Sequence, residues 1–261
     1  MWNGELLDLD AYLDRVAFTP DPAADRASTL RGLHRAHLAA ISFENADVRD
    51  GVPIALDVPS LQGKLVARRR GGYCFEQNLL FAAVLDRLGY EVTGLTGRVL
   101  LGRTGDIPRT HAVLRVDRRW LVDVGFGGGG LLEPLPLTAG ASARQGDWTF
   151  RLDHADGVWT LRSLQAGDWF ALYDFTEDPR GPADYRILNY YMSTNPASSF
   201  VGPLLAQRTD DHARHNLKDF ELTETRPDGS VVKRTLTPRE RETVLREEFG
   251  LDLPDRATAR A

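Results

Sequence analysis

Apolar residues in the first third of the chain recur at the three- and four-residue spacing of amphipathic helices. Leu9, Leu13 and Val16 share one helical face, and a second helical stripe follows the break at Pro20 and Pro22. The members of this second stripe are Leu30, Leu33, His37, Leu38 and Ile41. The pattern therefore predicts two helices before residue 42.

Two further helices are predicted before residue 90. Ser60 is a candidate N-cap for a third helix, because its hydroxyl suits that position. The apolar residues of this helix are Leu61, Leu65 and Val66. A fourth helix is predicted from about Cys74 to Leu88, where Gly89 would end it. Its apolar stripe consists of Leu80, Ala83, Val84 and Leu88.

The middle of the chain changes to short segments of strand type that are separated by turn residues. The predicted strands are 91–101, 111–116, 120–124, 148–153, 158–164 and 168–175. Turns are expected at 117–119 and at 154–157. Several short strands at such close spacing indicate an antiparallel sheet or a small barrel.

The last third combines both types of element. Segments 222–225 and 231–236 flank Pro227, Asp228 and Gly229, which together predict a hairpin. Residues 237–240 read Thr-Pro-Arg-Glu, a capping box with proline at the first helical position. A terminal helix is expected from there to about Phe249, ended by Gly250. The order along the chain is helical, then β, then mixed.

Composition narrows the class of protein. The chain has 261 residues, of which 42% are hydrophobic, enough for a substantial core or for two or three packed sub-domains. Its net charge of −5 gives no reason to expect nucleic acid or an anionic membrane as a partner. The N-terminal segment is acidic and resembles no secretory signal, and no stretch has the roughly eighteen apolar residues of a membrane span. We therefore expect a cytoplasmic protein.

The single cysteine limits the possible chemistry. One cysteine cannot form an internal disulfide, and it excludes a cysteine-rich zinc site. The sequence contains neither an HExxH motif nor a GxxxxGK[ST] phosphate loop. No metal site is therefore expected.

Cys74 lies between two glycines and a predicted helix. Gly71 and Gly72 permit a close backbone approach just before it. A helix that begins at Cys74 would place free N–H groups beside the sulfur, where they stabilise a thiolate. The same groups are suited to bind an oxyanion. The alternative is that Cys74 is simply a small buried apolar residue.

Two later residues have the types that activate a cysteine nucleophile. His111 begins a predicted strand, and Asp123 follows the next strand after a turn. A hairpin would bring them together, so that Asp123 orients His111 and His111 faces Cys74. The alternatives are a histidine at a sheet edge and an aspartate that accepts N–H groups in a turn.

A run of glycines, 127–130, follows Asp123. Its spacing is not that of a dinucleotide-binding fingerprint. The run is either a flexible loop or a backbone that a pantetheine arm or a flat acceptor approaches closely.

These motifs, taken together, resemble the arylamine N-acetyltransferase family. The matching segments are, in family order, ISFEN, RRGGYCFEQN, RTHAVL, LVDVGFGG and YYMSTNP. The resemblance implies an α+β fold with a papain-like core. Its parts would be a helical domain over 1–89, an antiparallel β-barrel over 90–182 and an α/β lid over 183–261. It also implies Cys74 as nucleophile, His111 as base and Asp123 as the residue that orients His111.

The resemblance further implies an acyl group that passes from a thioester, usually acetyl-CoA, to an aromatic amine, hydrazine or hydroxylamine. The implied substrate-binding residues are Phe43, Tyr73, Phe126 and Phe200, for which ordinary core aromatics are the alternative. The implied residues near the donor are Thr110, Gly127 and Gly128.

The sequence departs from the family pattern outside the three candidate catalytic residues. Ser42 replaces a proline, Gly129 a glutamine and Asn195 a histidine, and the segment from His111 to Asp123 is short. Loss of the glutamine side chain at Gly129 and the shortened segment would enlarge a pocket, which would suit the branch of the family that closes ansamycin macrolactams from a polyketide on a carrier protein.

Three other interpretations of the chain or its parts stay open. The chain is also consistent with a cysteine protease or transglutaminase, which share the Cys-His-Asp arrangement, or with a catalytically silent binding protein on the same fold. The basic run 68–70 is interpreted either as a phosphate contact or as a solvated or structural cluster.

Overall fold

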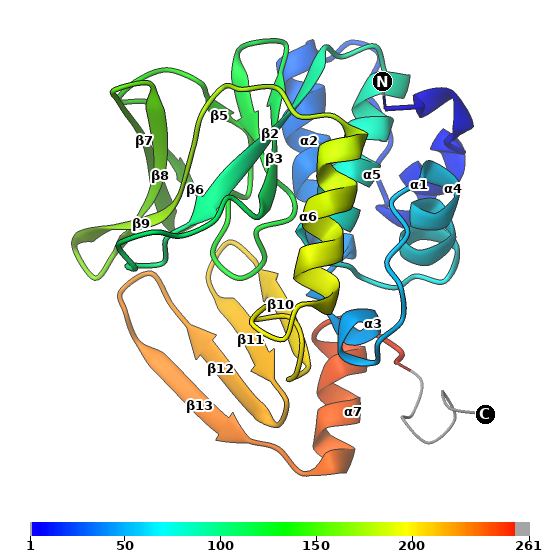
Figure 1. Cartoon of the computed structure of the whole chain (residues 1–261), viewed down its shortest axis with the longest axis vertical. Coiled ribbons are helices and arrows are strands. Elements are labelled where there is room, and N and C mark those ends of the chain that lie inside the picture. The colour runs from blue at the N-terminus through cyan, green and yellow to red at the C-terminus, as the bar shows by residue number, and fades with distance from the viewer. Residues whose placement is uncertain (1, 254–261) are drawn as a thin grey trace.

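Helix α5 (Cys74–Arg87) runs through the helical part of the chain, which a computed structural model describes over residues 2–253 (Figure 1). Every residue of α5 from Cys74 to Leu85 is buried. A helix that is buried on all sides belongs to a core rather than to a surface. Gly89 follows the helix with a φ of 77°, a left-handed conformation that suits glycine. The predicted helix and its end are confirmed.

The helical part contains other helices, all of which except the first share one apolar cluster with α5. They are η1 (Gly4–Leu6), α1 (Leu9–Arg15), α2 (Arg26–Ala40), α3 (Ala46–Arg49), α4 (Val58–Leu61) and the π-helix η2 (Gln62–Ala67). The predicted first and second helices correspond to α1 and α2. The prediction that Ser60 caps the third helix is wrong, because Asp57 is the cap and accepts a hydrogen bond from the Ser60 N–H. An aspartate three residues earlier satisfies this N–H, so the helix begins before Ser60.

Eight strands form one antiparallel sheet that curls into a nearly closed barrel (Figure 1). They are β2 (Val92–Val99), β3 (His111–Val116), β4 (Trp120–Val122), β5 (Leu135–Pro136), β6 (Ser142–Gln145), β7 (Trp148–Ala155), β8 (Val158–Gln165) and β9 (Asp168–Phe175). Their order in the sheet is β5-β4-β3-β2-β9-β8-β7-β6. Burial alternates along β7 and β8, as expected when one face of a strand points into the barrel. All six predicted strands are present, and β5 and β6 were not predicted.

The turn between β3 and β4 brings two residues of the candidate site, His111 and Asp123, close together. Asp117 and Arg118 both have positive φ, 48° and 54°, as in the two-residue turns that match the twist of a hairpin. Leu114 consequently pairs with Val122. His111 at the start of β3 and Asp123 just after β4 therefore lie on neighbouring strands, as predicted.

A second antiparallel sheet has the order β1-β10-β11-β12-β13. Its strands are β1 (Phe43–Glu44), β10 (Leu205–Thr209), β11 (Arg214–Lys218), β12 (Glu221–Thr225) and β13 (Val231–Thr235). The predicted hairpin is the β12–β13 pair. The predicted capping box at the start of α7 (Pro238–Glu247) is also present. β1 comes from the helical segment and pairs with β10, so this sheet joins residues from distant parts of the chain.

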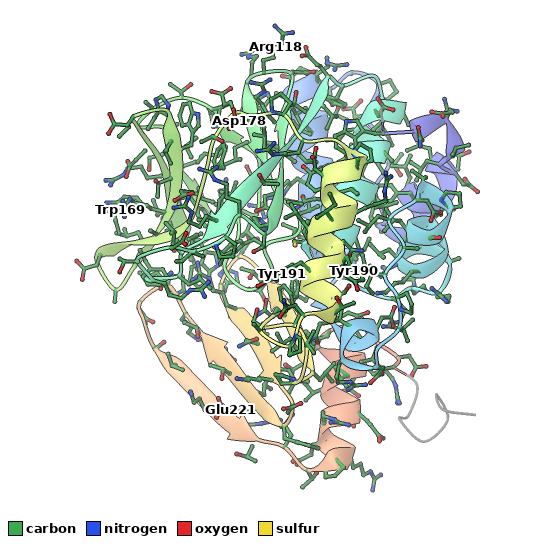
Figure 2. The ribbon with its side chains drawn as sticks, viewed as in Figure 1. Arg118, Trp169, Asp178, Tyr190, Tyr191 and Glu221 are labelled. Carbon is green, nitrogen blue, oxygen red and sulfur yellow. The ribbon has the colours of Figure 1, made fainter. Side chains whose placement is uncertain are left out.

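Helix α6 (Pro182–Thr194), which was not predicted, lies between the two sheets and the helical part. Tyr185, Asn189 and Met192 point inward from it, whereas Tyr190 is 71% exposed (Figure 2). The division into 1–89, 90–182 and 183–261 stays a prediction. Within residues 2–253, no helix is long and apolar enough to cross a membrane.

Candidate active site

Cys74 is the first residue of α5, and its side chain is almost completely buried. Its Sγ lies 3.9 Å from the backbone oxygen of Thr110, to which the thiol can donate. Gly125 packs directly against it, since a Cβ at residue 125 would meet the Cα of Cys74 at 2.8 Å. A glycine at this position therefore lets the loop after β4 pack against the backbone at the start of α5.

The imidazole of His111 lies between Cys74 and Asp123. Its Nε2 is 2.7 Å from Oδ2 of Asp123, and the ring also forms a hydrogen bond with the Cys74 side chain. Burial by itself would lower the pKa of His111, but the Asp123 carboxylate and the Cys74 sulfur outweigh it and raise this pKa to about 10. His111 is therefore a cation at neutral pH, held beside the sulfur.

Asp123 is held ionised by its surroundings. Burial opposes its charge, yet His111 and hydrogen bonds from Asn78 and the Gly125 N–H lower the pKa of the carboxyl group. The amide of Asn78 donates to Oδ1 at 2.9 Å and the Gly125 N–H donates to the same oxygen at 2.9 Å. The other carboxylate oxygen, Oδ2, contacts His111.

Asn78 connects all three parts of this arrangement, and the sequence analysis gave it no role. Its Nδ2 also donates to the backbone oxygen of Ala112 at 2.8 Å, and its Oδ1 accepts the Val124 N–H at 3.0 Å. It lies four residues after Cys74, so both project from one face of α5. That spacing was a usable signal, because a polar residue on the buried face of a helix needs partners.

The turn before Cys74 is fixed by buried charges. Glu76 accepts the Tyr73 N–H at 3.1 Å and the Lys64 ammonium at 2.7 Å, and burial raises the pKa of this carboxyl to about 7 despite the opposing effect of Lys64. Arg70 donates to Glu44 at 2.7 Å and to Asp47 at 2.9 Å. For Arg70, the structural interpretation of the basic run is therefore the correct one.

The four aromatic residues predicted as substrate-binding lie near the candidate site, three in contact with one another and the fourth against His111. Ring centroids lie 5.7 Å apart for Phe43 and Phe200, and 5.5 Å apart for Tyr73 and Phe200. Phe126 lies edge-on to His111 at 5.3 Å. The structure thus brings the four rings around one site. The Tyr73 hydroxyl donates to Asn189 on α6, which connects that helix to the site.

Tyr173 is a further neighbour that the sequence analysis missed. Its ring centroid is 5.1 Å from that of His111. Burial, followed by the nearby Asp123 carboxylate, raises the pKa of its hydroxyl well above the usual value. β9 pairs with β2, which also pairs with β3, so the sheet brings together residues about 60 positions apart and no local signal identifies Tyr173.

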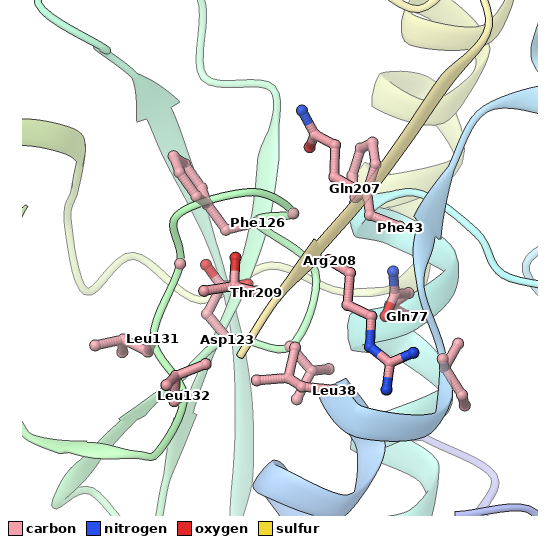
Figure 3. A pocket seen from close by; sticks show the side chains of 14 residues that line it. Leu38, Phe43, Gln77, Asp123, Phe126, Leu131, Leu132, Gln207, Arg208 and Thr209 are labelled. Carbon is pink, nitrogen blue, oxygen red and sulfur yellow. The ribbon is translucent and has the colours of Figure 1, made fainter. Parts of the chain in front are cut away.

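A narrow cavity of about 20 Å³ lies beside Asp123, enough space for about one water molecule (Figure 3). Its lining includes Leu38, Phe43, Gln77, Phe126 and Gln207. Gln207 on β10 also accepts the Gly128 N–H at 3.0 Å and sits beside Gly127. The glycine run is therefore held against the second sheet.

Comparison with known proteins agrees with this geometry. A family model described as N-acetyltransferase matches residues 27–258. An arylamine N-acetyltransferase of Mycolicibacterium smegmatis is 39% identical over 260 residues, covering 96% of this chain and 94% of that protein. The chain belongs to the arylamine N-acetyltransferase family.

Solved structures of the family have the same fold. The arylamine N-acetyltransferase of Nocardia farcinica has a TM-score of 0.90 and 44% identity, with 97% of this chain and 92% of that chain covered. The Mycobacterium marinum enzyme in complex with CoA has a TM-score of 0.89 and 38% identity, with 96% of each chain covered. The α+β fold that the resemblance implied is confirmed.

The three residues that depart from the family pattern, Ser42, Asn195 and Gly129, each contact another part of the chain. Ser42 is buried and donates to the backbone oxygen of Phe249 at 2.6 Å, which holds the end of α7. Asn195 accepts the Ala197 N–H at 2.8 Å in the turn after α6. Gly129 has a φ of 123°, and a Cβ there would meet the guanidinium of Arg214 at 3.3 Å. A side chain at residue 129 would therefore begin in tight contact with Arg214.

Within residues 2–253, no group of three or more His, Cys, Asp or Glu side chains is arranged to hold a metal ion.

Proposed function

We propose that this chain transfers an acetyl group from acetyl-CoA to an aromatic amine or hydrazine through an acyl-enzyme on Cys74. The observation that carries the proposal is the position of His111, which contacts the Cys74 sulfur on one side and Asp123 on the other. A cationic imidazole next to a thiol favours the thiolate, which is the nucleophilic form. The named activity of the relatives supports the same reaction.

The proposed reaction has two half-reactions. The Cys74 thiolate attacks the thioester carbonyl, the bond between that carbon and the CoA sulfur breaks, and the thiolate of CoA leaves with the proton of His111. The neutral amine then attacks the acetyl-enzyme, and the Cys74 sulfur is released as the new amide bond forms. His111 takes the proton that the amine nitrogen loses. Asp123 keeps the imidazole oriented throughout.

The surroundings of Cys74 suit these steps. Thr110 and the loop of Gly127 and Gly128 border the side from which we propose that the donor approaches. The rings of Phe43, Tyr73, Phe126 and Phe200 offer apolar faces for an aromatic acceptor. The acyl-enzyme would be sheltered from water, because the Cys74 side chain is only 3% exposed.

The macrolactam-forming alternative finds no support in these contacts. It rested on the missing glutamine side chain at Gly129 and on the short segment from His111 to Asp123, and the guanidinium of Arg214 lies 3.3 Å from where a Cβ of residue 129 would stand. The names of the relatives given above point to arylamine N-acetylation and not to an amide synthase. A carrier protein as donor therefore stays a prediction that the structure does not favour.

Intact-protein mass spectrometry tests the proposal directly. Acetyl-CoA should add one acetyl group to the wild type, and an aniline or hydrazine should remove it as the amide. Cys74→Ala should fold and stay unmodified. A folded Cys74→Ala variant with a near wild-type rate of amide formation would rule out the acyl-enzyme. Second-order acylation rates should favour acetyl-CoA over a long-chain acyl thioester, and the reverse order would restore the macrolactam-forming alternative.

A further inference from the structure

Arg214 is a buried cation that lacks an anionic partner. It begins β11, and only 8% of its surface is exposed. Within residues 2–253 no carboxylate forms an ion pair with it, and burial alone lowers the pKa of its guanidinium to about 10. A buried charge without an opposite charge is costly and uncommon in proteins.

The local contacts of Arg214 leave donors unused. Its guanidinium lies 3.8 Å from the ring centroid of Trp148, a cation–π contact. Nη2 lies 3.5 Å from the backbone oxygen of Gly129, and the buried Nε has no hydrogen-bond partner. Arg15 is about equally buried and also has no carboxylate partner among the described residues, yet its Nε donates to the backbone oxygen of Leu65 at 3.0 Å. Arg214 therefore differs from a buried arginine whose role is structural.

The glycine loop connects Arg214 to the nucleophile. Gly125 lies against Cys74 at one end of the loop, and Gly129 lies against the guanidinium at the other. Four residues of chain span at most about 14 Å. A thioester donor whose reacting carbonyl lies at Cys74 and whose arm follows this loop would bring its phosphate groups toward Arg214. A planar guanidinium is well suited to bind phosphate oxygens in pairs.

We propose that Arg214 binds a phosphate group of the thioester donor and so selects donors that carry one. This inference rests on the proposed acetyl transfer. It also explains why residue 129 is a glycine in this chain, because any side chain at that position would press against the guanidinium that the donor must reach.

The test compares donors with and without phosphate in Arg214→Met, which keeps an apolar side chain against Trp148 but removes the charge. The KM for acetyl-CoA should rise roughly tenfold or more, because a charge-assisted hydrogen bond is lost. The KM for S-acetylpantetheine, which has no phosphate, should stay within about twofold of the wild-type value, and kcat with either donor should change little. Arg15→Met, matched for burial and for the absence of a carboxylate partner, should leave both KM values unchanged.

Equal rises for both donors, or none, would overturn the proposal. An effect on both acetyl-CoA and S-acetyl-4′-phosphopantetheine would assign the contact to the phosphate of the arm, and an effect on acetyl-CoA alone would assign it to the nucleotide end. If Arg214→Met does not fold, Arg214→Lys keeps the charge without the planar fork. It should show a smaller rise confined to the phosphate-bearing donors, and a rise common to all donors would again refute the assignment. If the proposed acetyl transfer itself is wrong, no donor will acetylate Cys74 of the wild type, and this result is distinct from any outcome with Arg214→Met.

Discussion

Replacement of Asn78 by alanine tests how the candidate site is held together. The change removes three hydrogen bonds, to Ala112, Asp123 and Val124, in a place with no access to water. A buried N–H left unpaired, here that of Val124, costs about 1–3 kcal/mol, and each other bond contributes about 1 kcal/mol. We therefore expect the free energy of unfolding to fall by about 3–5 kcal/mol.

The same change should slow the acylation of Cys74. Without the Asn78 amide, Asp123 loses a donor that helps to lower the pKa of its carboxyl group, and the carboxylate can rotate away from His111. Misplacement of an orienting group by about 1 Å can cost about a hundredfold in rate. The rate of acetyl-enzyme formation, measured by rapid mixing, should fall by about that factor in protein that is still folded.

Urea unfolding followed by circular dichroism measures the stability change. Gln165→Ala is the matched control, since it also removes an amide but only one hydrogen bond, to Ser163, on the far strand β8. We expect the control to lose about 1 kcal/mol or less and to keep the wild-type acylation rate. If Asn78→Ala is no less stable than Gln165→Ala, or is acylated at the wild-type rate, the role assigned to the three hydrogen bonds of Asn78 is wrong.

Three other predictions follow from the site and its neighbours. His111→Ala and Asp123→Asn should both slow alkylation of Cys74 by iodoacetamide at pH 6, because the cation beside the sulfur is lost or misoriented. Alkylation rates equal to the wild type in both variants would contradict an ion pair between the Cys74 thiolate and the His111 imidazolium. Burial lowers the pKa of His34 to about 4 and of His37 to about 3, below the value of about 6.5 in the unfolded chain, so the free energy of unfolding should fall as the pH drops from about 6.5 to 4. His111 changes the free energy of unfolding in the opposite direction with pH. Its raised pKa of about 10 stabilises the fold fully below about pH 6.5, and this contribution is lost as the pH rises through 10. Urea unfolding at several pH values should therefore show a flatter acid limb in His37→Gln and a flatter alkaline limb in Asp123→Asn, and unchanged limbs would refute the assignments. Gly129→Gln should destabilise the protein by about 1–3 kcal/mol, because the φ of 123° at residue 129 and the contact with Arg214 both oppose a side chain. The melting temperature checks this against Gly51→Gln, whose position has a positive φ of 72° but open space around it. An equal loss of stability in the two variants would exclude a role for the Arg214 contact.

Local sequence patterns determined most of the elements of this fold. The helical stripe and Gly89 identified α5, and the turn residues between short strands identified the hairpins of the barrel. Helix α6 was missed although Pro182 stands in its first turn and Asp184 accepts the Gly181 N–H, both local signals of a helix start. Strands β10 and β11 were not predicted either, and β10 pairs on one side with β1, more than 150 residues earlier in the chain, a contact that no local pattern indicates.

The candidate catalytic residues were identified because each lies in a short motif with chemistry of its own. A cysteine before a helix, a histidine that begins a strand and an aspartate after the next strand are all visible in the chain. Their partners are not, because a hydrogen bond depends on where separate elements come to rest. The amide of Asn78 meets Ala112 and Asp123 only when α5 packs against β3 and β4.

The sequence also does not show which side chains of the site are charged. A histidine in the sequence has no particular pKa, and this fold lowers that of His34 and His37 by burial but raises that of His111 through Asp123 and Cys74. Gly129 in the sequence suggested empty space, whereas Arg214, 85 positions later, lies against it. Composition and spacing thus determined which reactive groups the chain has. Only the tertiary structure decided which of them are charged, buried and in contact, because electrostatic and hydrogen-bond energies depend on distances and on the exclusion of water.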